Sequence, residues 1–215
     1  MIPHIIGIAG GFGHGKDEVG KVLVEEFGYV RRAFGECLKK EVHQALNGFV
    51  AFDPIYGRNE MPTACREALE TCIGVGQLDP FVKPTTPEMR RLLQQYGTEF
   101  RRNQNLDYWV HCLADERPFP KRVVVTDVRF RNESDWVWRN SGEVWRVVRP
   151  VAQYSYGDAR VTRHASEILL KDAPVDWIID NSSTLKDLRQ QVRCRMLLHG
   201  STVSSTKEPD LPAVQ

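Results

Sequence analysis

A glycine-rich segment near the N-terminus has the composition of a phosphate-binding loop. Residues 10–17 read GGFGHGKD and match the spacing G-x-x-x-x-G-K. Glycines in such a loop let backbone N–H groups point inward at phosphate oxygens, and Lys16 can reach the outer phosphates of a nucleotide. Asp17 stands where Ser or Thr is usual, and its carboxylate can contact a magnesium ion or one of that ion's waters. The candidate phosphate-binding residues are Gly11, Gly13, His14, Gly15, Lys16 and Asp17.

A second candidate follows the apolar run VVVT at residues 123–126. Asp127 stands at the end of this predicted strand, where a carboxylate can be directed at magnesium. Four charged or amide side chains follow it at once, and two guanidinium groups near a carboxylate suit phosphate recognition. A turn residue or helix cap at Asp127 and a solvated charged turn after it are the alternatives. The four following residues are Arg129, Arg131, Asn132 and Glu133.

An arginine-rich segment over residues 90–102 carries the third signal. Arg90, Gln94 and Arg101 are spaced by four and seven residues and would share one face of a helix. That face could present cations and an amide to a nucleotide monophosphate, and a solvated arginine face is the alternative. Nearby, Tyr108 and Trp109 could stack on a base, whereas core packing is the alternative for at least one of them.

Residues 149–167 form the fourth region and read as a loop of mixed charge. Arg149 and Arg163 in this loop could arrive over transferring phosphates and exclude water, as the cations of a lid do. A flexible surface loop with incidental arginines explains the same composition.

These residues need a scaffold, and the apolar pattern predicts one. Strands alternating with helices indicate a three-layer α/β domain with a mostly parallel sheet, in which ligands bind at the carboxyl ends of the strands. The predicted strands are 4–9, 29–34, 121–130, 143–148 and 177–180. The predicted helices are 17–27, 36–46, 64–73, 87–103, 106–115, 132–140 and one that begins near 185.

The composition is that of an ordinary globular protein. The chain has 215 residues, of which 41% are hydrophobic and 27% charged, with a formal net charge of +1. This excludes disordered and collagen-like chains and gives no global electrostatic reason to expect a nucleic acid polymer or a membrane as partner. The five cysteines are odd in number and lack CxxC spacing, so we expect free thiols in a reducing compartment such as the cytoplasm.

Together these segments resemble the bacteriophage-type deoxynucleoside monophosphate kinases of the P-loop kinase superfamily. The resemblance covers residues 5–188, and TDVRFRNE (126–133), HASE (164–167) and IIDN (178–181) are more specific than the loop alone. The GKD form of the loop is typical of that family, and Glu18 stands where its members usually have a hydroxyl residue. The resemblance implies a three-layer α/β/α P-loop NTPase fold over residues 1–200. Within it, 47–116 would be a helical acceptor region and 149–167 a lid, with a disordered tail at 201–215.

The resemblance also implies an activity: transfer of the γ-phosphoryl group of ATP to a deoxynucleoside 5′-monophosphate, which supplies precursors for DNA synthesis. ATP and the monophosphate would be the partners, magnesium the cofactor held by Asp17 and Asp127, and Asn181 would lie near the adenine. We expect Lys16, Asp127 and Arg129 to be catalytic. A host cytoplasm is expected if a phage encodes the chain, and a homodimer is left open. The implied acceptor residues are Phe34, Lys39, Arg91, Gln94, Arg101, Arg129, Asn132 and Glu133, to which base stacking adds Trp109.

Two other functions fit the loop. A related kinase could use another small phosphorylated acceptor, and a non-catalytic protein could bind ATP without transferring phosphate. An acceptor phosphate oxygen is already anionic near neutral pH, so the expected catalysis consists of alignment and charge neutralisation rather than general-base chemistry.

Overall fold

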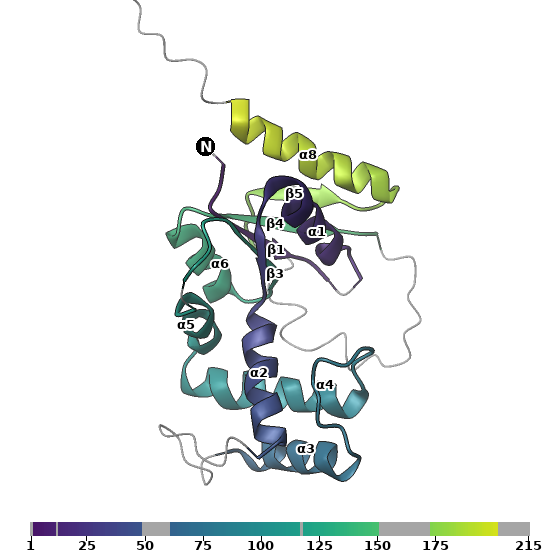
Figure 1. The fold of residues 1–215 in the computed structure, drawn as a ribbon, viewed down its shortest axis with the longest axis vertical. Coiled ribbons are helices and arrows are strands. Elements are labelled where there is room, and N and C mark those ends of the chain that lie inside the picture. The colour runs from purple at the N-terminus through teal and green to yellow at the C-terminus, as the bar shows by residue number, and fades with distance from the viewer. Residues whose placement is uncertain (1, 12, 49–60, 117, 151–172, 202–215) are drawn as a thin grey trace, which may run out of the picture.

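The computed structural model describes residues 2–11, 13–48, 61–116, 118–150 and 173–201. In this part of the chain a five-stranded sheet has the order β2-β3-β1-β4-β5, and each neighbouring pair is parallel (Figure 1). All five predicted strands are confirmed. Their bounds are β1 (Ile5–Ala9), β2 (Val30–Arg32), β3 (Val123–Val128), β4 (Glu143–Val148) and β5 (Trp177–Asp180).

Strand β1 is the centre of the sheet and is buried along its whole length. Its neighbour β3 aligns Val124 with Ile6, while β4 on the other side aligns Trp145 with Ile8. Apolar residues on both faces of a strand are typical of a parallel sheet that helices cover on both sides. The carboxyl ends of β1 and β3 therefore lie side by side, which brings the glycine-rich loop and Asp127 to the same edge of the sheet.

Helices cover both faces of the sheet and make the three-layer α/β/α fold expected from the sequence. Helices α1 (Lys16–Phe27) and α8 (Leu185–Ser201) pack through Leu23 and Val192 against one face. Helix α6 (Arg131–Arg139) packs through Val137 against the other face, next to the first turn of α2 (Phe34–Leu46). The core thus divides into two apolar clusters, one on each side of the sheet.

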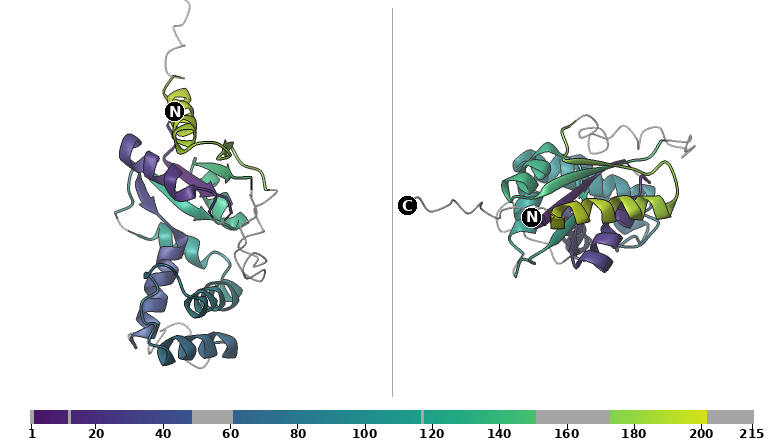
Figure 2. Two further views of the ribbon diagram at one scale, coloured as in Figure 1. Left: turned by 90° about the vertical axis from the view of Figure 1, so that its right-hand side faces the viewer. Right: turned by 90° about the horizontal axis from the view of Figure 1, so that it is seen from above.

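A group of helices extends from one end of the sheet (Figures 1 and 2). Helix α2 runs into this group and contacts every other helix in it. The apolar residues that hold the group together are continuous with the core on the α6 face of the sheet. Its other members are α3 (Thr63–Gly74), α4 (Pro87–Gln94), the π-helix η2 (Gln95–Arg102) and α5 (Tyr108–Ala114).

The helix predicted over residues 87–103 is two elements in the structure. It begins as α4, where the Thr86 hydroxyl accepts a hydrogen bond from the amide of Met89 at 3.3 Å. From Gln95 onward it continues as the π-helix η2. A π-helix bonds residue i to i+5, so it rotates the side chains relative to an α-helix and is frequent at functional sites. Arg90 and Gln94 lie four residues apart in α4 and share a face as predicted, whereas the placement of Arg101 on that face was wrong because it assumed α-helical spacing throughout.

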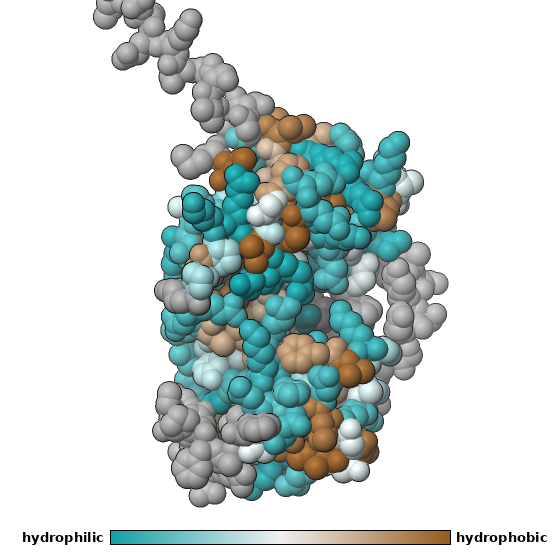
Figure 3. Space-filling model, in the orientation of Figure 1, coloured by the Kyte–Doolittle hydropathy of each residue, from teal (hydrophilic) through white to brown (hydrophobic). Residues whose placement is uncertain are grey.

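The surface is mixed, and the face shown in Figure 3 is largely hydrophilic. Exposed apolar residues occur after α3, where Val75 is 58% and Val82 61% exposed. Within the described ranges, no helix combines the length and the hydropathy needed to cross a membrane.

Candidate functional site

The loop after β1 has a backbone that only glycine adopts without strain. Gly13 and Gly15 have φ of +72° and +101°, and a Cβ on Gly15 would lie 2.6 Å from Nδ2 of Asn181. A Cβ on Gly10 would lie 2.5 Å from the carbonyl oxygen of Val147. When left-handed residues alternate with right-handed ones, successive backbone N–H groups turn toward a common point. The concavity that results, called a nest, binds anions. The glycines therefore give this loop a backbone that other residues could not adopt without strain, and its binding of phosphate stays a prediction.

Two side chains fasten this loop to the neighbouring strands. Nδ1 of His14 lies 3.1 Å from the carbonyl oxygen of Val147 at the end of β4. Nδ2 of Asn181, directly after β5, donates to the carbonyl oxygen of His14 at 2.8 Å. The structure therefore gives Asn181 a positioning contact with the loop backbone, and its expected place near the adenine stays a prediction.

Lys16 occupies the first position of α1, and its ammonium group lies over the loop. Nζ donates to the carbonyl oxygens of Gly10 and Gly11, each at 2.7 Å. The adjacent Asp17 is exposed, whereas the Glu18 carboxylate is bound by Nε of Arg189 on α8 at 2.7 Å. The loop therefore places one cation and the positive end of a helix at the same point, which favours an anionic ligand.

Asp127 is the penultimate residue of β3 and holds the start of α2. Its two carboxylate oxygens accept hydrogen bonds from the amides of Phe34 at 2.9 Å and Gly35 at 2.7 Å. Burial raises the pKa of Asp127, while these amides and the nearby Arg129 act in the opposite direction. The structure shows the helix-capping alternative for Asp127, at the edge of the sheet where the glycine-rich loop lies, and its magnesium-directed role stays a prediction.

The oxygen atoms at this edge suit magnesium that arrives with a nucleotide. Magnesium prefers one or two carboxylates together with substrate phosphates and water rather than a cage made by the protein alone. Among the described residues, no three His, Cys, Asp or Glu side chains cluster as a cage would require. Asp17 is exposed, and each oxygen of Asp127 keeps a further lone pair beyond its amide contact. The residues present therefore fit the ion, with Asp17 and Asp127 as its candidate ligands.

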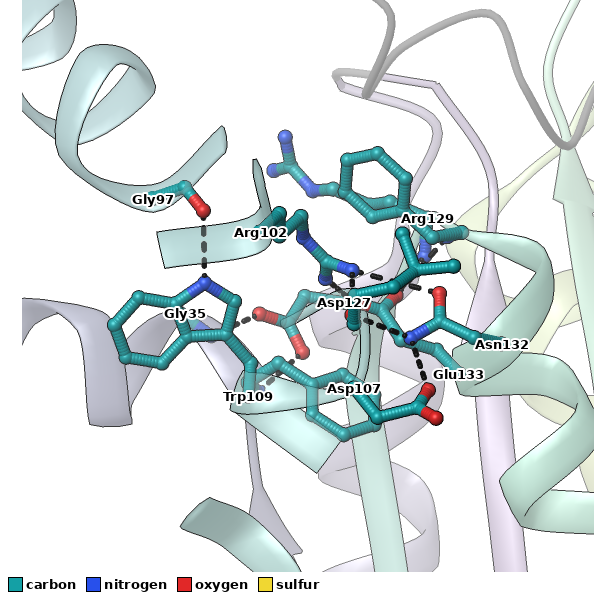
Figure 4. A network of polar contacts seen from close by, with 12 residues as sticks. Gly35, Gly97, Arg102, Asp107, Trp109, Asp127, Arg129, Asn132 and Glu133 are labelled. Atoms are coloured by element: carbon teal, nitrogen blue, oxygen red, sulfur yellow. Dashed lines mark hydrogen bonds and ion pairs between the residues drawn. The ribbon is translucent and has the colours of Figure 1, made fainter. Parts of the chain in front are cut away.

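Glu133 is buried in the first turn of α6 and holds the turn that carries Arg129 (Figure 4). Its Oε2 accepts from the amides of Arg129 at 2.7 Å and Phe130 at 3.0 Å, and its Oε1 forms an ion pair with Nη2 of Arg102. Burial raises the pKa of Glu133 to about 7, and the charge of Arg102 only partly opposes this. In this structure Glu133 positions the Arg129 turn; its contact with an acceptor nucleotide stays a prediction.

Asn132 joins the same turn to the segment before α5. Nδ2 of Asn132 donates to the carbonyl oxygen of Leu106 and to Oδ1 of Asp107, both at 2.9 Å, and the Arg102 guanidinium reaches the same carbonyl oxygen at 3.2 Å (Figure 4). Arg102 thus connects η2, α6 and the start of α5. The sequence places Arg102 in the arginine-rich segment beside Arg101, but its role in joining these elements was not predicted.

Arg101 points to a different partner from that of its neighbour Arg102. Its guanidinium forms an ion pair with Glu41 of α2 and stacks 4.9 Å from the Tyr108 ring. The hydroxyl groups of Tyr96 and Tyr108 donate to the same carboxylate at 2.8 Å and 3.2 Å, and burial raises the pKa of Tyr96. Glu41 was not predicted, and its only sequence signal is a charge on a helix with an apolar face.

Trp109 has a packing role rather than an open stacking surface. It is 3% exposed, its Nε1 donates to the carbonyl oxygen of Gly97 at 3.0 Å, and its ring meets Tyr108 edge-on at 4.8 Å. The prediction that a base stacks on Trp109 is corrected here, because both ring faces lie in the core. Core packing had been the alternative for this residue.

The other predicted acceptor residues are spread over the helical group. Phe34 is buried edge-on against Trp136 at 6.0 Å, and Lys39 lies 5.6 Å from the Phe81 ring. Burial and the charge of Lys83 lower the pKa of Lys39. Arg91 is exposed on α4 beside a hollow against α3, and Gln94 is half-buried at the end of α4, so these two do not join the network around Asp127.

The predicted lid is only partly covered by the structure. Arg149 is exposed just after β4, at the carboxyl edge of the sheet. Arg163 and the remainder of the lid from residue 151 onward lie outside the described residues, so their roles stay predictions.

Comparison with known proteins identifies similar sequences and structures. The sequence is 25% identical over 204 residues to a protein of Acanthamoeba polyphaga mimivirus that is provisionally named a deoxynucleotide monophosphate kinase, and the match spans 87% of this chain and 93% of that one. Among solved structures, dephospho-CoA kinase from Campylobacter jejuni matches with a TM-score of 0.46 and 14% identity, over 91% of this chain and 96% of that one. TT1252 from Thermus thermophilus matches with a TM-score of 0.43 and 18% identity, over 92% and 98%.

The family match covers the half of the chain that carries Asp127, Arg129, Glu133 and Asn181. Residues 80–192 match the family described as deoxynucleotide monophosphate kinase, which is just over half of the chain. The glycine-rich loop lies outside the matched range, so its geometry is an independent observation. The chain belongs to the deoxynucleotide monophosphate kinase family.

Proposed function

We propose that this protein transfers the γ-phosphoryl group of ATP to a deoxynucleoside 5′-monophosphate. The observation that carries the proposal is the loop after β1, where glycines of positive φ and the Lys16 ammonium converge at the N-terminus of α1. Such a site binds an anion through backbone amides, a helix dipole and one cation, as nucleotide phosphates require. The family to which the chain belongs supplies the second half of the argument, because its members are named for a monophosphate acceptor.

ATP would bind with its phosphates in the loop. The Lys16 ammonium, which lies over Gly10 and Gly11, would move onto the β- and γ-phosphate oxygens, and Asn181 would keep the loop closed from the side of β5. A magnesium ion bound with ATP would neutralise charge on the same oxygens. Asp17 and Asp127 would hold that ion, because both carboxylates belong to the carboxyl edge of the sheet.

The monophosphate would approach from the side of α2 and the Arg129 turn. Its phosphate oxygens are anionic near neutral pH, so the nucleophile needs orientation rather than deprotonation by a base. Arg129 would hold this phosphate against the γ-phosphoryl group, and the turn that carries Arg129 is fixed by two backbone hydrogen bonds to the buried Glu133. Because this turn is held rigidly, less reorganisation free energy is needed to place the Arg129 guanidinium where negative charge develops during transfer.

The test is a coupled assay of ADP release with ATP, magnesium and each of the four deoxynucleoside monophosphates, with the ribonucleotides alongside. Lys16→Ala should lower turnover by orders of magnitude and leave the thermal unfolding transition in place. Lys21→Ala is the matched control, since Lys21 is an exposed lysine on α1 with a long 3.9 Å contact to Glu25. ATP binding without turnover of any monophosphate would contradict the proposal.

A further inference from the structure

Helices α2 and α5 lie antiparallel, and polar contacts fix their alignment at both ends. At one end, Nε of Arg32, just before α2, donates to Oε2 of Glu116, just after α5, at 2.7 Å. At the other end, the hydroxyl group of Tyr108 in α5 donates to Oε2 of Glu41 in α2 at 3.2 Å. Residues midway between these contacts must therefore face each other across the two helices.

Two cysteines occupy this midway position. Cys37 precedes Glu41 by one helical turn, and Cys112 follows Tyr108 by one turn, so each lies on the contacting face of its helix. Their thiol groups lie within hydrogen-bonding reach of each other. Cys37 is 4% exposed, whereas Cys112 is an exposed residue, so one member of the pair lies at the surface and the other is shielded.

The surroundings make the exposed sulfur the one that ionises first. The hydrogen bond to Cys112 and burial both raise the pKa of Cys37, which therefore keeps its proton. The hydrogen bond from Cys37 lowers the pKa of Cys112, and Lys40 acts in the same direction, while burial, Glu41 and Glu116 oppose it. A solvent-accessible thiolate beside a second thiol is the arrangement that redox-sensitive cysteines share.

We propose that Cys37 and Cys112 are a redox-active pair, which closes into an intramolecular disulfide on reaction with a hydroperoxide and reopens with a dithiol reductant. The Cys112 thiolate attacks one peroxide oxygen, so an S–O bond forms, the O–O bond breaks and the departing oxygen takes a proton. The Cys37 sulfur then attacks the Cys112 sulfenic acid. An S–S bond forms, the S–O bond breaks, and the hydroxide leaves with the Cys37 proton as water. Two thiols are oxidised and one peroxide is reduced.

The other cysteines provide internal controls. Cys65 and Cys72 are buried in α3. Cys194 is exposed like Cys112, but it lies on α8, which covers the opposite face of the sheet, and its sulfur accepts from the Gln190 side chain at 3.5 Å. Cys194 therefore has similar access to solvent without the neighbouring thiol of Cys37.

The experiment treats the full-length reduced protein with hydrogen peroxide in small molar excess, blocks the remaining thiols with N-ethylmaleimide and measures intact mass without reductant. We expect a loss of two hydrogens, two fewer maleimide adducts and a linked peptide pair that contains residues 37 and 112, all reversed by dithiothreitol. Cys194→Ser should leave this result unchanged and Cys112→Ser should abolish it. In the reduced protein, iodoacetamide should modify Cys112 faster than Cys194 at neutral pH.

Three results would overturn the proposal. The first is oxidation of Cys112 to a sulfinic acid with no linked peptide. The second is a disulfide-linked dimer through Cys112 or Cys194 in place of the intramolecular link. The third is no loss of free thiols under peroxide that oxidises a model dithiol in the same buffer. Because each readout is a mass or a peptide, the outcome does not depend on the proposed kinase activity.

Discussion

Arg102 and Glu133 form a buried ion pair that joins the π-helix η2 to the first turn of α6 (Figure 4). The other oxygen of Glu133 accepts the amides of Arg129 and Phe130. Arg102 therefore acts on Arg129 through one carboxylate, although the two arginines lie on different elements. The ion pair links the arginine-rich segment to the turn after β3, which the sequence showed only as separate signals.

Replacing Arg102 with methionine should destabilise the fold strongly. The substitution keeps an unbranched apolar chain but leaves Glu133 buried without its cation, and breaking a buried pair in this way typically costs about 3–5 kcal/mol. The free energy of unfolding, measured with urea at pH 8, tests this. Arg139→Ala on the exposed end of α6 is the control, with an expected change within about 0.5 kcal/mol. A loss below about 1 kcal/mol in the Arg102 variant would contradict the role given to the pair.

Stability should fall as the pH rises toward 7. Folding raises the pKa of Glu133 from its ordinary value of 4.5 to about 7, so between these values the folded chain holds a proton that the unfolded chain has lost. The free energy of unfolding then decreases with pH by at most about 1.4 kcal/mol per unit across this window. Glu133→Gln should remove this slope. Burial also raises the pKa of Asp127, so the difference between wild type and variant, rather than either curve alone, reports Glu133.

Much of the scaffold could be predicted because local signals agree with it. The apolar run of β1 and the three valines of β3 both favour a strand, and the glycines after β1 favour a turn. Parallel pairing of β1 with β3 then brings the carboxyl ends of the two strands together. The loop residues Gly13, Gly15 and Lys16 were found for this reason. Their spacing is visible within eight consecutive residues, whereas the contacts of the loop with Val147 and Asn181 are not.

The rest of the site depends on distant pairing and on one irregular helix. Arg101 and Arg102 are adjacent, yet their partners are Glu41 and Glu133, far apart in the chain. The π-helix decides which arginine faces which carboxylate, and residue spacing assumed the regular α-helical repeat. The resemblance implies an acceptor-binding role for Glu133, and that role stays a prediction. Its hydrogen bonds to the Arg129 and Phe130 amides were not predicted, because Phe130 stands at the N-cap position where Ser or Thr would mark a capping box.

Gly15→Ala should weaken ATP binding. The substituted residue would have to keep a φ of +101°, and its Cβ would lie 2.6 Å from Nδ2 of Asn181. Left-handed backbone alone costs about 1–2 kcal/mol outside glycine, which corresponds to roughly tenfold weaker binding or more. Isothermal titration with ATP and magnesium measures the change. Gly74→Ala is the matched control, since nothing lies within 4 Å of its Cβ position and no positive φ is recorded there; unchanged affinity in the Gly15 variant would contradict the loop assignment.

Asp127→Asn should affect both the helix and the metal requirement. The two amides bond to different oxygens of Asp127, and Asn replaces one of these oxygens with an NH2 donor, so the start of α2 should lose about 0.5–2 kcal/mol of capping free energy. The loss of charge should also raise the magnesium concentration needed for half-maximal turnover. Urea unfolding without nucleotide measures the first effect and a magnesium titration of turnover the second. A shift in unfolding with an unchanged magnesium titration would leave Asp127 as a cap only.

Arg129→Ala should impair use of the monophosphate more than binding of ATP. The proposed contact of Arg129 is with the acceptor phosphate and the transferring group, and removing one donor from developing charge typically costs about 10²–10³ in rate. The comparison is between steady-state kinetics for the acceptor and the dissociation constant for ATP, which should stay within about twofold of wild type. Arg131→Ala is the control two residues away, because its guanidinium is exposed and bound to Asp135 at 2.8 Å. Both substitutions remove one positive charge from the same surface. Equal effects on turnover would therefore show that Arg129 acts only through the local charge of the turn and not through the proposed phosphate contact.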